Sequence, residues 1–465
     1  MGKGASEMQR PAGRTSTAGI TLLVCLLGIT TSPVNGQCSF GWKSGGFTIA
    51  LDEAVQALTV YDGRLIAGGW FTNAGGVEAP GIASWNGAAW SSLGAGADNG
   101  VDFGVYALIA HDGKLYAGGD FTMAGSTPAN AVAMWDGASW SPLGTGIGNG
   151  FNTVWALAIY NNQLIAAGDF TTAGGVSANR IARWDGKAWW PLGTGVSGTV
   201  YALAVYNNEL IVAGNFTTAG GLLVNRIARW NGIAWSPLGG GMNSTVSALA
   251  VYNNDLIAGG RFTTAGSTNA NRVAKWNGFA WSALGSGMAG SGNVEVTALT
   301  VHDHALIAGG EFTSAGGVNA SHIARWNGTS WSALGTGISR ISDSPAVYAL
   351  ATFRGDLVAG GAFDFAGGQL SFNWARWGAL GPFLATDFNQ DCRVDADDLA
   401  MFEACSAGPA VPYPDASAGC TLTADPAGYI PADFDKDHDV DQDDFGIFQR
   451  CYASENLAAD PTCQN

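Results

Sequence analysis

Short runs of alternating hydrophobic and polar residues fill residues 38–383, and glycine-rich or asparagine-rich turns separate them. One unit of this pattern spans residues 200–239 and reads VYALAVYNNELIVAGNFTTAGGLLVNRIARWNGIAWSPLG. It contains four runs with the period and length that are typical of β-strands. Pairs such as Asn207-Asn208 and Asn231-Gly232 lie between the runs and favour the type I′ turns of β-hairpins. Each unit is therefore predicted to fold as a four-stranded antiparallel sheet.

The unit occurs seven times along the chain, and a phenylalanine after the second run marks each copy. These phenylalanines are Phe71, Phe121, Phe170, Phe216, Phe262, Phe312 and Phe363. A single sheet of this size cannot bury both of its faces, whereas several sheets stacked around an axis can. The sequence therefore predicts an all-β fold, a seven-bladed β-propeller over residues 37–383.

The two ends of the repeat array complement each other. In six copies the fourth run begins at a tryptophan, namely Trp90, Trp140, Trp189, Trp235, Trp281 and Trp331. The seventh copy lacks this run, but Trp42 begins a matching one near the start of the chain. We expect this N-terminal strand to complete the last blade, because a closed ring leaves no sheet edge open to aggregation.

Differences in length between the copies fall between the fourth-run tryptophan and the next copy. These variable connections include residues 98–103, 148–152, 289–295 and 339–345. Alternate turns of a meander lie on opposite rims, so all of them share one rim with the loop that follows each marker phenylalanine. Variable loops on a rigid scaffold commonly carry recognition, and neutral drift in exposed linkers is the alternative.

The residue before each marker phenylalanine also varies, and it ends the second strand on the variable rim. The candidate ligand-binding residues at this position are Trp70, Asp120, Asp169, Asn215, Arg261 and Glu311. A mixed ring of this kind would suit a polar ligand such as a glycan, whereas local ion pairing or backbone capping is the alternative. Asp120 and Asp169 are also candidates for an acid–base pair across neighbouring blades. The sequence contains no nucleophile motif and no phosphate-binding loop.

Composition and charge separate a further region from the propeller. The 465-residue chain has a formal net charge of −16, which argues against nucleic acids and anionic membranes as partners. Residues 384–465 contain 17 acidic and 3 basic residues and carry most of this charge. The break in composition predicts a second domain over residues 384–465.

The N-terminus has the layout of a secretory signal peptide over residues 1–36. Basic residues precede a short apolar run at 20–29, and a small-residue exit at 34–36 follows it. The run is about half the ~20 residues that a membrane span needs. We therefore expect a secreted or cell-surface protein with no membrane span in the mature chain. Six of the seven cysteines remain after cleavage, and an even number in an exported chain favours disulfide bonds.

Two stretches of the acidic region, 46 residues apart, have the ligand spacing of an EF-hand calcium loop. Oxygen donors occupy positions 1, 3, 5, 9 and 12, and position 7 supplies a backbone carbonyl. The predicted ligands are Asp387, Asn389, Asp391, Arg393, Asp395 and Asp398 in the first loop, and Asp433, Asp435, Asp437, Asp439, Asp441 and Asp444 in the second. The spacing therefore predicts two bound Ca²⁺ ions and a helix after each loop.

Both regions resemble known families. The segments LIAGG at 306–310 and RWNG at 325–328, followed by Trp331, resemble the kelch repeat, whose propellers include binding modules and enzymes. The two calcium loops, with aspartate at position 12 and Gly419-Cys420 between them, resemble a dockerin of the Gly-Cys type. Position 6 departs from the family, since Cys392 and His438 replace the usual glycine.

The dockerin resemblance implies a calcium-dependent tail that binds a cohesin-like or other cell-surface or extracellular protein. We would pair Cys405 with Cys420 and Cys451 with Cys463, which leaves Cys38 and Cys392, although six cysteines allow 15 connectivities. Dockerins commonly accompany polysaccharide-degrading enzymes. The first hypothesis is therefore a non-catalytic recognition or scaffold propeller in a polysaccharide-related assembly. The second is a propeller glycoside hydrolase or polysaccharide lyase, and a purely structural role is the third.

Overall fold

The computed structural model describes residues 40–43, 50–148, 152–341 and 345–380 of the repeat region. In the acidic region it describes residues 388, 396–405, 422, 430–434, 440, 444–445 and 448. The predicted signal peptide and every cysteine except Cys405 lie outside these ranges. The same holds for most of the predicted calcium ligands.

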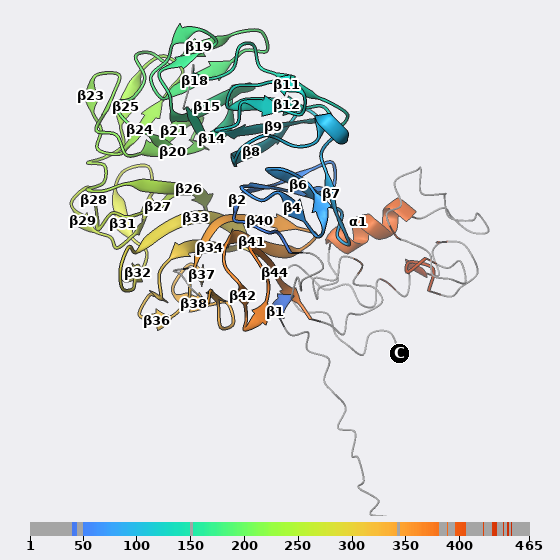
Figure 1. Cartoon of the computed structure of the whole chain (residues 1–465). Helices are drawn as coiled ribbons and strands as arrows, with labels where there is room; N and C mark the ends of the chain where they lie inside the picture. Colours follow the sequence, from blue (N-terminus) through green and yellow to red (C-terminus); the bar gives the residue numbers. More distant parts are fainter. Residues whose placement is uncertain are drawn as a thin grey trace, which may run out of the picture. The chain divides into compact units, whose positions relative to one another are not determined.

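The repeat region forms a β-propeller, and its described residues contain seven four-stranded antiparallel sheets (Figure 1). The first strand of each sheet lies next to the first strands of the neighbouring sheets, so the seven first strands line the inside of the ring. These inner strands are β2 (Val55–Tyr61), β8 (Val105–His111), β14 (Thr153–Tyr160), β20 (Val200–Tyr206), β26 (Val246–Tyr252), β33 (Glu295–His302) and β40 (Ala346–Phe353). The second strands are β3 (Arg64–Gly69), β9 (Lys114–Gly119), β15 (Gln163–Asp169), β21 (Glu209–Gly214), β27 (Asp255–Gly260), β34 (Ala305–Glu311) and β41 (Asp356–Ala362).

The third and fourth strands complete each sheet toward the outside of the ring. The third strands are β6 (Ile82–Trp85), β12 (Val132–Trp135), β18 (Ile181–Trp184), β24 (Ile227–Trp230), β30 (Val273–Trp276), β37 (Ile323–Trp326) and β44 (Trp374–Ala379). The fourth strands are β7 (Trp90–Ser92), β13 (Trp140–Pro142), β19 (Trp189–Pro191), β25 (Trp235–Pro237), β31 (Trp281–Ala283), β38 (Trp331–Ala333) and β1 (Phe40–Lys43). The paired tryptophans of the third and fourth strands lie 5.1 to 5.5 Å apart between ring centroids in all seven sheets.

Short ladders form between the second and third strands of each sheet, and two of them gain a third strand, β32 or β39, from the connection that precedes the sheet. Their strands are β4 (Asn73–Ala74), β5 (Val77–Glu78), β10 (Met123–Ala124), β11 (Thr127–Pro128), β16 (Thr172–Ala173), β17 (Val176–Ser177), β22 (Thr218–Ala219), β23 (Leu222–Leu223), β28 (Thr264–Ala265), β29 (Thr268–Asn269), β32 (Met288–Ala289), β35 (Ser314–Ala315), β36 (Val318–Asn319), β39 (Ile338–Ser339), β42 (Phe365–Ala366) and β43 (Gln369–Leu370). A 3₁₀ turn, η1 (Gly96–Asp98), lies in the first variable connection.

The turns between strands are of two kinds, and only one is the predicted type. Between first and second strands both turn residues have positive φ, as at Asn207 (49°) and Asn208 (61°), which fits the predicted type I′ turn. Between third and fourth strands, four residues separate the paired tryptophans Trp230 and Trp235. There the Asn231 side chain accepts hydrogen bonds from the backbone N–H groups of Ile233 and Ala234. The type I′ prediction for the Asn-Gly turns was therefore wrong, because an Asx turn serves instead.

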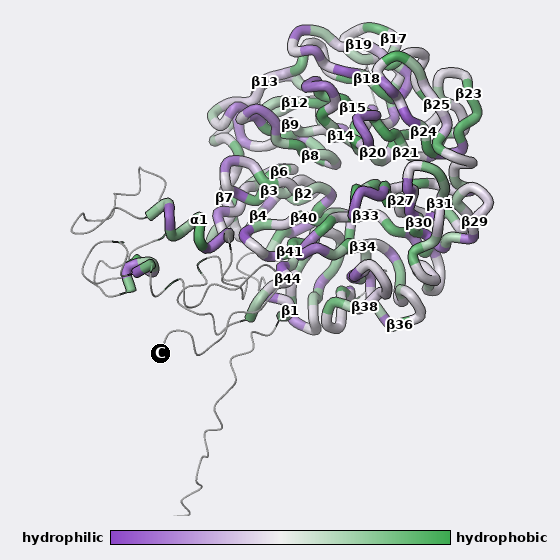
Figure 2. The backbone as a smooth tube through the Cα atoms, turned by 180° about the vertical axis from the view of Figure 1, so that it is seen from behind, coloured by the Kyte–Doolittle hydropathy of each residue, from purple (hydrophilic) through white to green (hydrophobic). Residues whose placement is uncertain are grey.

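Hydrophobic clusters lie between consecutive sheets all around the ring, and apolar residues recur in every sheet (Figure 2). The cluster around Val55 and Phe71 of the first sheet includes Val358 and Trp374 of the last, so the ring is closed by apolar packing. Strand β1 pairs antiparallel with β44, with Trp42 opposite Trp377 (Figure 1). This is the pairing that the repeat spacing predicts.

One hydrogen bond repeats between sheets and includes the N-terminal strand. The Trp235 indole Nε1 donates to the Leu192 carbonyl of the preceding sheet at 3.0 Å. The Trp42 indole makes the equivalent bond to Leu334, also at 3.0 Å. Because both groups are buried, each bond satisfies polar atoms that would otherwise be costly to bury. Trp42 therefore has the same role as the tryptophans inside the array.

The described residues of the acidic region contain helix α1 (Ala396–Cys405) and a small apolar cluster that includes Phe402, Val440 and Phe448. Cys405 is buried and disulfide-bonded. Within the part of the chain that the structure describes, no helix has the length and apolar character of a membrane span.

Candidate functional site

The inner strand of every sheet carries a β-bulge at the same position. The ladder register shifts between the valine and the alanine of the repeated V-x-A-L sequence, as between Val55 and Ala57. The bulge residue between them is half-buried, whereas its two neighbours are buried. The seven bulge residues are Gln56, Tyr106, Trp155, Tyr201, Ser247, Thr297 and Tyr348. A bulge leaves its residue out of the ladder and redirects its side chain.

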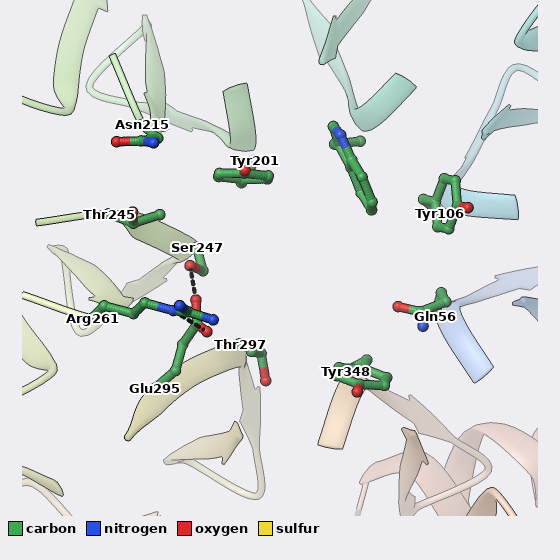
Figure 3. A pocket seen from close by; sticks show the side chains of 11 residues that line it. Gln56, Tyr106, Tyr201, Asn215, Thr245, Ser247, Arg261, Glu295, Thr297 and Tyr348 are labelled. Carbon is green, nitrogen blue, oxygen red and sulfur yellow. Dashed lines mark hydrogen bonds and ion pairs between the residues drawn. The ribbon is translucent and has the colours of Figure 1, made fainter. Parts of the chain in front are cut away.

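All seven bulge residues line one cavity of about 460 Å³, which we call the axial cavity. Each of the seven sheets contributes one of them, so the cavity lies at the centre of the ring. Figure 3 shows the side chains arranged around a common space, with Arg261, Glu295 and Ser247 on one side and Tyr106 and Gln56 on the other. Asn215 and Thr245 add further polar groups to the wall.

One side of the axial cavity is aromatic. The ring centroids of Tyr106 and Trp155 are 4.4 Å apart with an interplanar angle of 34°. Trp155 and Tyr201 follow at 5.9 Å, and Trp70 lies 6.3 Å from Tyr106. Such pairs add about 0.5–1.5 kcal/mol beyond the area that they bury. We call Tyr106, Trp155 and Tyr201 the aromatic arc, and Trp70 adjoins it without lining the axial cavity.

The other side carries ionised groups. The Arg261 guanidinium Nε lies 2.7 Å from Glu295 Oε2, and the Ser247 hydroxyl donates to Glu295 Oε1. The side chain of Glu295 is only 9% exposed, while that of Arg261 is 50% exposed. Glu311 is the cross-strand partner of Glu295. We call Ser247, Arg261, Glu295 and Glu311 the charged cluster.

The charged cluster shifts the pKa of Glu311. Burial raises the pKa of this carboxyl, and the negative charge of Glu295 raises it further. The Arg261 guanidinium acts in the opposite direction, but the net pKa of Glu311 remains above its ordinary value. The arginine also hydrogen-bonds Glu295, which raises the pKa of Arg261. The geometry therefore holds one carboxylate in an ion pair and leaves its neighbour easier to protonate.

A second cavity, of about 240 Å³, adjoins the aromatic arc. Trp70, Phe103 and Tyr106 line it, together with part of the variable connection after the first sheet. The Trp70 indole Nε1 donates to the Tyr106 hydroxyl at 2.8 Å, and this hydroxyl donates to Asp120 Oδ2 at 3.0 Å. Tyr106 is the residue that the two cavities share.

The residues that precede the marker phenylalanines, which we predicted to form one ring, lie in different places in the structure. Asn215 and Arg261 line the axial cavity, Trp70 and Asp120 line the second cavity, and Glu311 belongs to the charged cluster. These residues do not surround one common space.

Asp120 and Asp169 each interact with groups close to them. Asp120 accepts hydrogen bonds from the Tyr106 hydroxyl and the Gly104 N–H, while Asp169 forms an ion pair with Arg180 of its own sheet at 3.1 Å. The geometry therefore favours local pairing over a shared acid–base role for these two carboxylates.

The sequence analysis missed the bulge residues and Glu295. A signal was present, because the residue before each Ala-Leu pair varies among Gln, Tyr, Trp, Ser and Thr, whereas valine precedes it and alanine follows it in all seven copies. Strict strand alternation places such a residue on one face of its sheet, and the alternation does not reveal a bulge.

Three of the predicted calcium ligands are described, and all three are buried: Asp398, Asp433 and Asp444. Asp398 Oδ1 accepts a hydrogen bond from the backbone N–H of Phe388 at 2.7 Å, and Asp444 Oδ1 accepts one from Phe434 at 2.6 Å. The two contacts are equivalent, since each joins position 12 of a loop to position 2. Among the residues that the structure describes, no three His, Cys, Asp or Glu side chains are grouped as a metal site. The other predicted ligands lie outside those residues.

The sequence matches the family described as "Domain of unknown function (DUF5122) beta-propeller" over residues 62–83, 111–133 and 161–184. These segments fall in the first three sheets and support a propeller domain. No match to the sequence was found among curated proteins.

Several solved structures are similar to this chain. The WD40 β-propeller domain of Doa1 is 12% identical, with 73% of this chain and 97% of that chain covered and a TM-score of 0.42. An extracellular domain of BT4673 from B. thetaiotaomicron is 10% identical, with 72% and 39% covered and a TM-score of 0.46. The computationally designed Ika8 protein is 20% identical, with 70% and 88% covered and a TM-score of 0.40.

Proposed function

We propose that this protein is an exported, non-catalytic recognition protein whose seven-bladed propeller binds a neutral glycan in the axial cavity. The observation that carries the proposal is the ring of seven bulge residues, one from each sheet, around a single cavity. The bulge is common to all the sheets, but its side chain varies among five residue types, with tyrosine in three sheets. A ligand at this position contacts every repeat and meets amide, hydroxyl and aromatic groups.

The chemistry of the wall supports a sugar as the ligand. A sugar ring has apolar C–H faces, which pack on aromatic rings, and a rim of hydroxyls, which pair with amides, hydroxyls and charged groups. The aromatic arc supplies the first kind of surface. Gln56, Asn215, Thr245 and Thr297 supply the second. Because Glu295 already neutralises Arg261 and Glu311 lies beside them, the cavity offers no free cation to an anionic ligand.

Binding can be tested on arrays of neutral and anionic glycans, with affinities then measured by calorimetry. We expect neutral glycans to bind and polyuronates not to bind. Trp155→Ala should reduce affinity, whereas Trp190→Ala is a matched control because this indole is 47% exposed on the outer strand β19. Loss of binding in the control alone, or no glycan binding at all, would reject the proposal.

We also propose that residues 384–465 form a dockerin-like module that binds two Ca²⁺ ions and attaches the propeller to a cohesin-like or other cell-surface protein. The equivalent contacts of Asp398 and Asp444 support two loops of one design. The burial of both carboxylates supports an internal role for them, because buried charges are paired or coordinate metals. The expected ligands are those predicted from the EF-hand spacing.

Calcium titration by calorimetry tests the tail. We expect two binding events in the full chain, one event in Asp398→Ala or Asp444→Ala, and none in the double variant. Asp415→Ala, outside both loops, is the control. An absence of heat and of ordering at millimolar calcium would reject the dockerin-like reading.

The charged cluster favours one alternative, a glycoside hydrolase or polysaccharide lyase. The Glu295 carboxylate forms an ion pair with Arg261, whereas burial and the charge of Glu295 raise the pKa of Glu311, and two carboxyl groups in different environments are what acid–base catalysis of glycosides requires. Turnover of a bound glycan that Glu311→Gln abolishes without loss of binding would establish this alternative. Binding without turnover in the wild-type protein supports recognition.

A further inference from the structure

Two cavities of this propeller are connected through one side chain. Tyr106 lines the axial cavity with its neighbours in the ring and also lines the second cavity with Trp70 and Phe103. The second cavity is built from the ends of the first two sheets and from the connection between them. A ligand that extends outward from the axis at Tyr106 would therefore enter the second cavity.

The second cavity presents two exposed aromatic side chains, Trp70 (58% exposed) and Phe103 (60% exposed). Trp70 is nevertheless held in place, because its Nε1 donates to the Tyr106 hydroxyl and this hydroxyl donates to Asp120. The polar edge of the indole is satisfied inside the protein. Its open face is left for an apolar contact, and a fixed aromatic ring loses little conformational entropy on binding.

Gly104 makes this placement of the indole possible. A Cβ atom at residue 104 would lie 2.5 Å from Trp70 Cδ1 and 2.6 Å from Trp70 Nε1. These distances are well inside van der Waals contact. Any side chain at residue 104 would displace the indole from this place. A glycine is therefore required at residue 104 for the observed position of Trp70. The backbone N–H of Gly104 also donates to Asp120 Oδ1, which fixes the carboxylate that Tyr106 contacts.

We infer that Trp70, Phe103 and Tyr106 form a second subsite, which stacks one ring of a neutral oligosaccharide while the next ring lies in the axial cavity. The inference rests on the proposed function and adds the length and direction of the ligand. The ligand has at least two sugar units and runs from the axis outward between the first and second sheets. A carbohydrate fits both parts, because each combines an aromatic face with hydrogen-bonding groups and neither offers an unpaired cation.

The experiment uses the full chain and neutral gluco-, xylo- and manno-oligosaccharides of one to six units, with affinities from calorimetry and tryptophan fluorescence. In the wild-type protein we expect affinity to rise by roughly tenfold when the ligand becomes long enough to reach Trp70, an increment that aromatic stacking can supply. Trp70→Ala should remove this increment and leave the affinity for the shortest bound ligand unchanged, because Trp70 does not line the axial cavity. Trp190→Ala should retain the increment.

The outcomes separate the two proposals. If no neutral saccharide binds, the proposed function fails and the second subsite fails with it. If saccharides bind but affinity does not depend on length, or if Trp70→Ala retains the increment, only the second subsite is overturned. Because Trp70 is exposed, Trp70→Ala should fold normally, and an unchanged melting temperature would confirm that the lost increment is local.

Discussion

The aromatic arc and the charged cluster occupy different parts of the wall of one cavity, with Glu311 beside Glu295, and the same repeated fold produces both. Sheets two to four contribute Tyr106, Trp155 and Tyr201, whereas sheets five and six contribute Ser247, Arg261, Glu295 and Glu311. The backbone bulge is the same on both sides. The repeated backbone therefore determines where the side chains of the cavity wall lie. The identity of the side chain at each of these places determines the chemistry of the wall.

The two sides also differ in how they are stabilised. The aromatic arc is held by ring contacts and by the hydrogen bond from the Tyr106 hydroxyl to Asp120. The charged cluster is a partly desolvated ion pair with an extra carboxylate, so its stability depends on every member and on the protonation of Glu311. Substitutions on the charged side should therefore have larger and more pH-dependent effects.

The largest effect is expected for Glu295→Ala. This substitution removes the partner of Arg261 and the acceptor of the Ser247 hydroxyl, so two groups lose their hydrogen bonds together. We expect a loss of about 1–3 kcal/mol in the free energy of unfolding, below the range for a fully buried pair because Arg261 is half-exposed. Urea unfolding measures this loss of stability.

Glu209→Ala, which breaks the more exposed Arg229–Glu209 pair, is the control and should lower the free energy of unfolding by less than about 1 kcal/mol. Equal losses in the two variants would contradict the special position of Glu295.

Trp155→Ala should have the next largest effect, and this effect should appear in binding. Trp155 contacts both Tyr106 and Tyr201, so its removal interrupts the aromatic arc in the middle. We expect roughly tenfold weaker binding of neutral oligosaccharides, since each aromatic contact is worth about 0.5–1.5 kcal/mol. Trp155→Phe should retain most of the affinity. If both variants bind equally weakly, the indole edge rather than the aromatic face is what the ligand requires.

Ser247→Ala should have a smaller effect than either. It removes one hydrogen bond to Glu295 but leaves the ion pair with Arg261 in place. We expect the free energy of unfolding to fall by about 0.5–1.5 kcal/mol, the usual net value of one hydrogen bond. Thr297→Val, at the bulge of the next sheet, allows comparison with a position outside the cluster. A larger loss at Thr297 than at Ser247 would argue that the cluster is not a cooperative unit.

The smallest effect is expected for Glu311→Gln, and its sign depends on pH. The folded protein holds the Glu311 proton more tightly than the unfolded chain, because the pKa of this carboxyl is raised. Stability contributed by this group therefore falls as pH rises through its pKa, and it does not change where both states are protonated. The melting temperature of Glu311→Gln should exceed that of the wild-type protein at pH 7–8 and match it near pH 4. A lower melting temperature at pH 8 would show that the ionised Glu311 stabilises the fold.

The sequence predicts the repeated units, the strand order and the pairing of Trp42 with the last sheet. It does so because the hydrophobic residues recur periodically and because the seventh copy lacks a strand that is found at the N-terminus. The axial cavity could not be predicted. Its members come from a bulge that displaces Gln56, Tyr106 and their equivalents from the ladder, and hydrophobic alternation carries no sign of such a displacement. Arg261 and Asn215 were found because each directly follows a second strand, at a position that varies between two fixed residues.

The pairing of β1 with β44 has a consequence for how the protein is made. Strand β1 leaves the ribosome about 330 residues before its partner, which at typical synthesis rates means a delay of roughly 20–60 seconds. Throughout that time the last sheet does not exist and both ends of the growing stack are uncovered. A chain that stops before Trp374 would keep those edges and invite pairing with other chains. Completion of the final repeat thus removes the open edges that a shortened chain keeps.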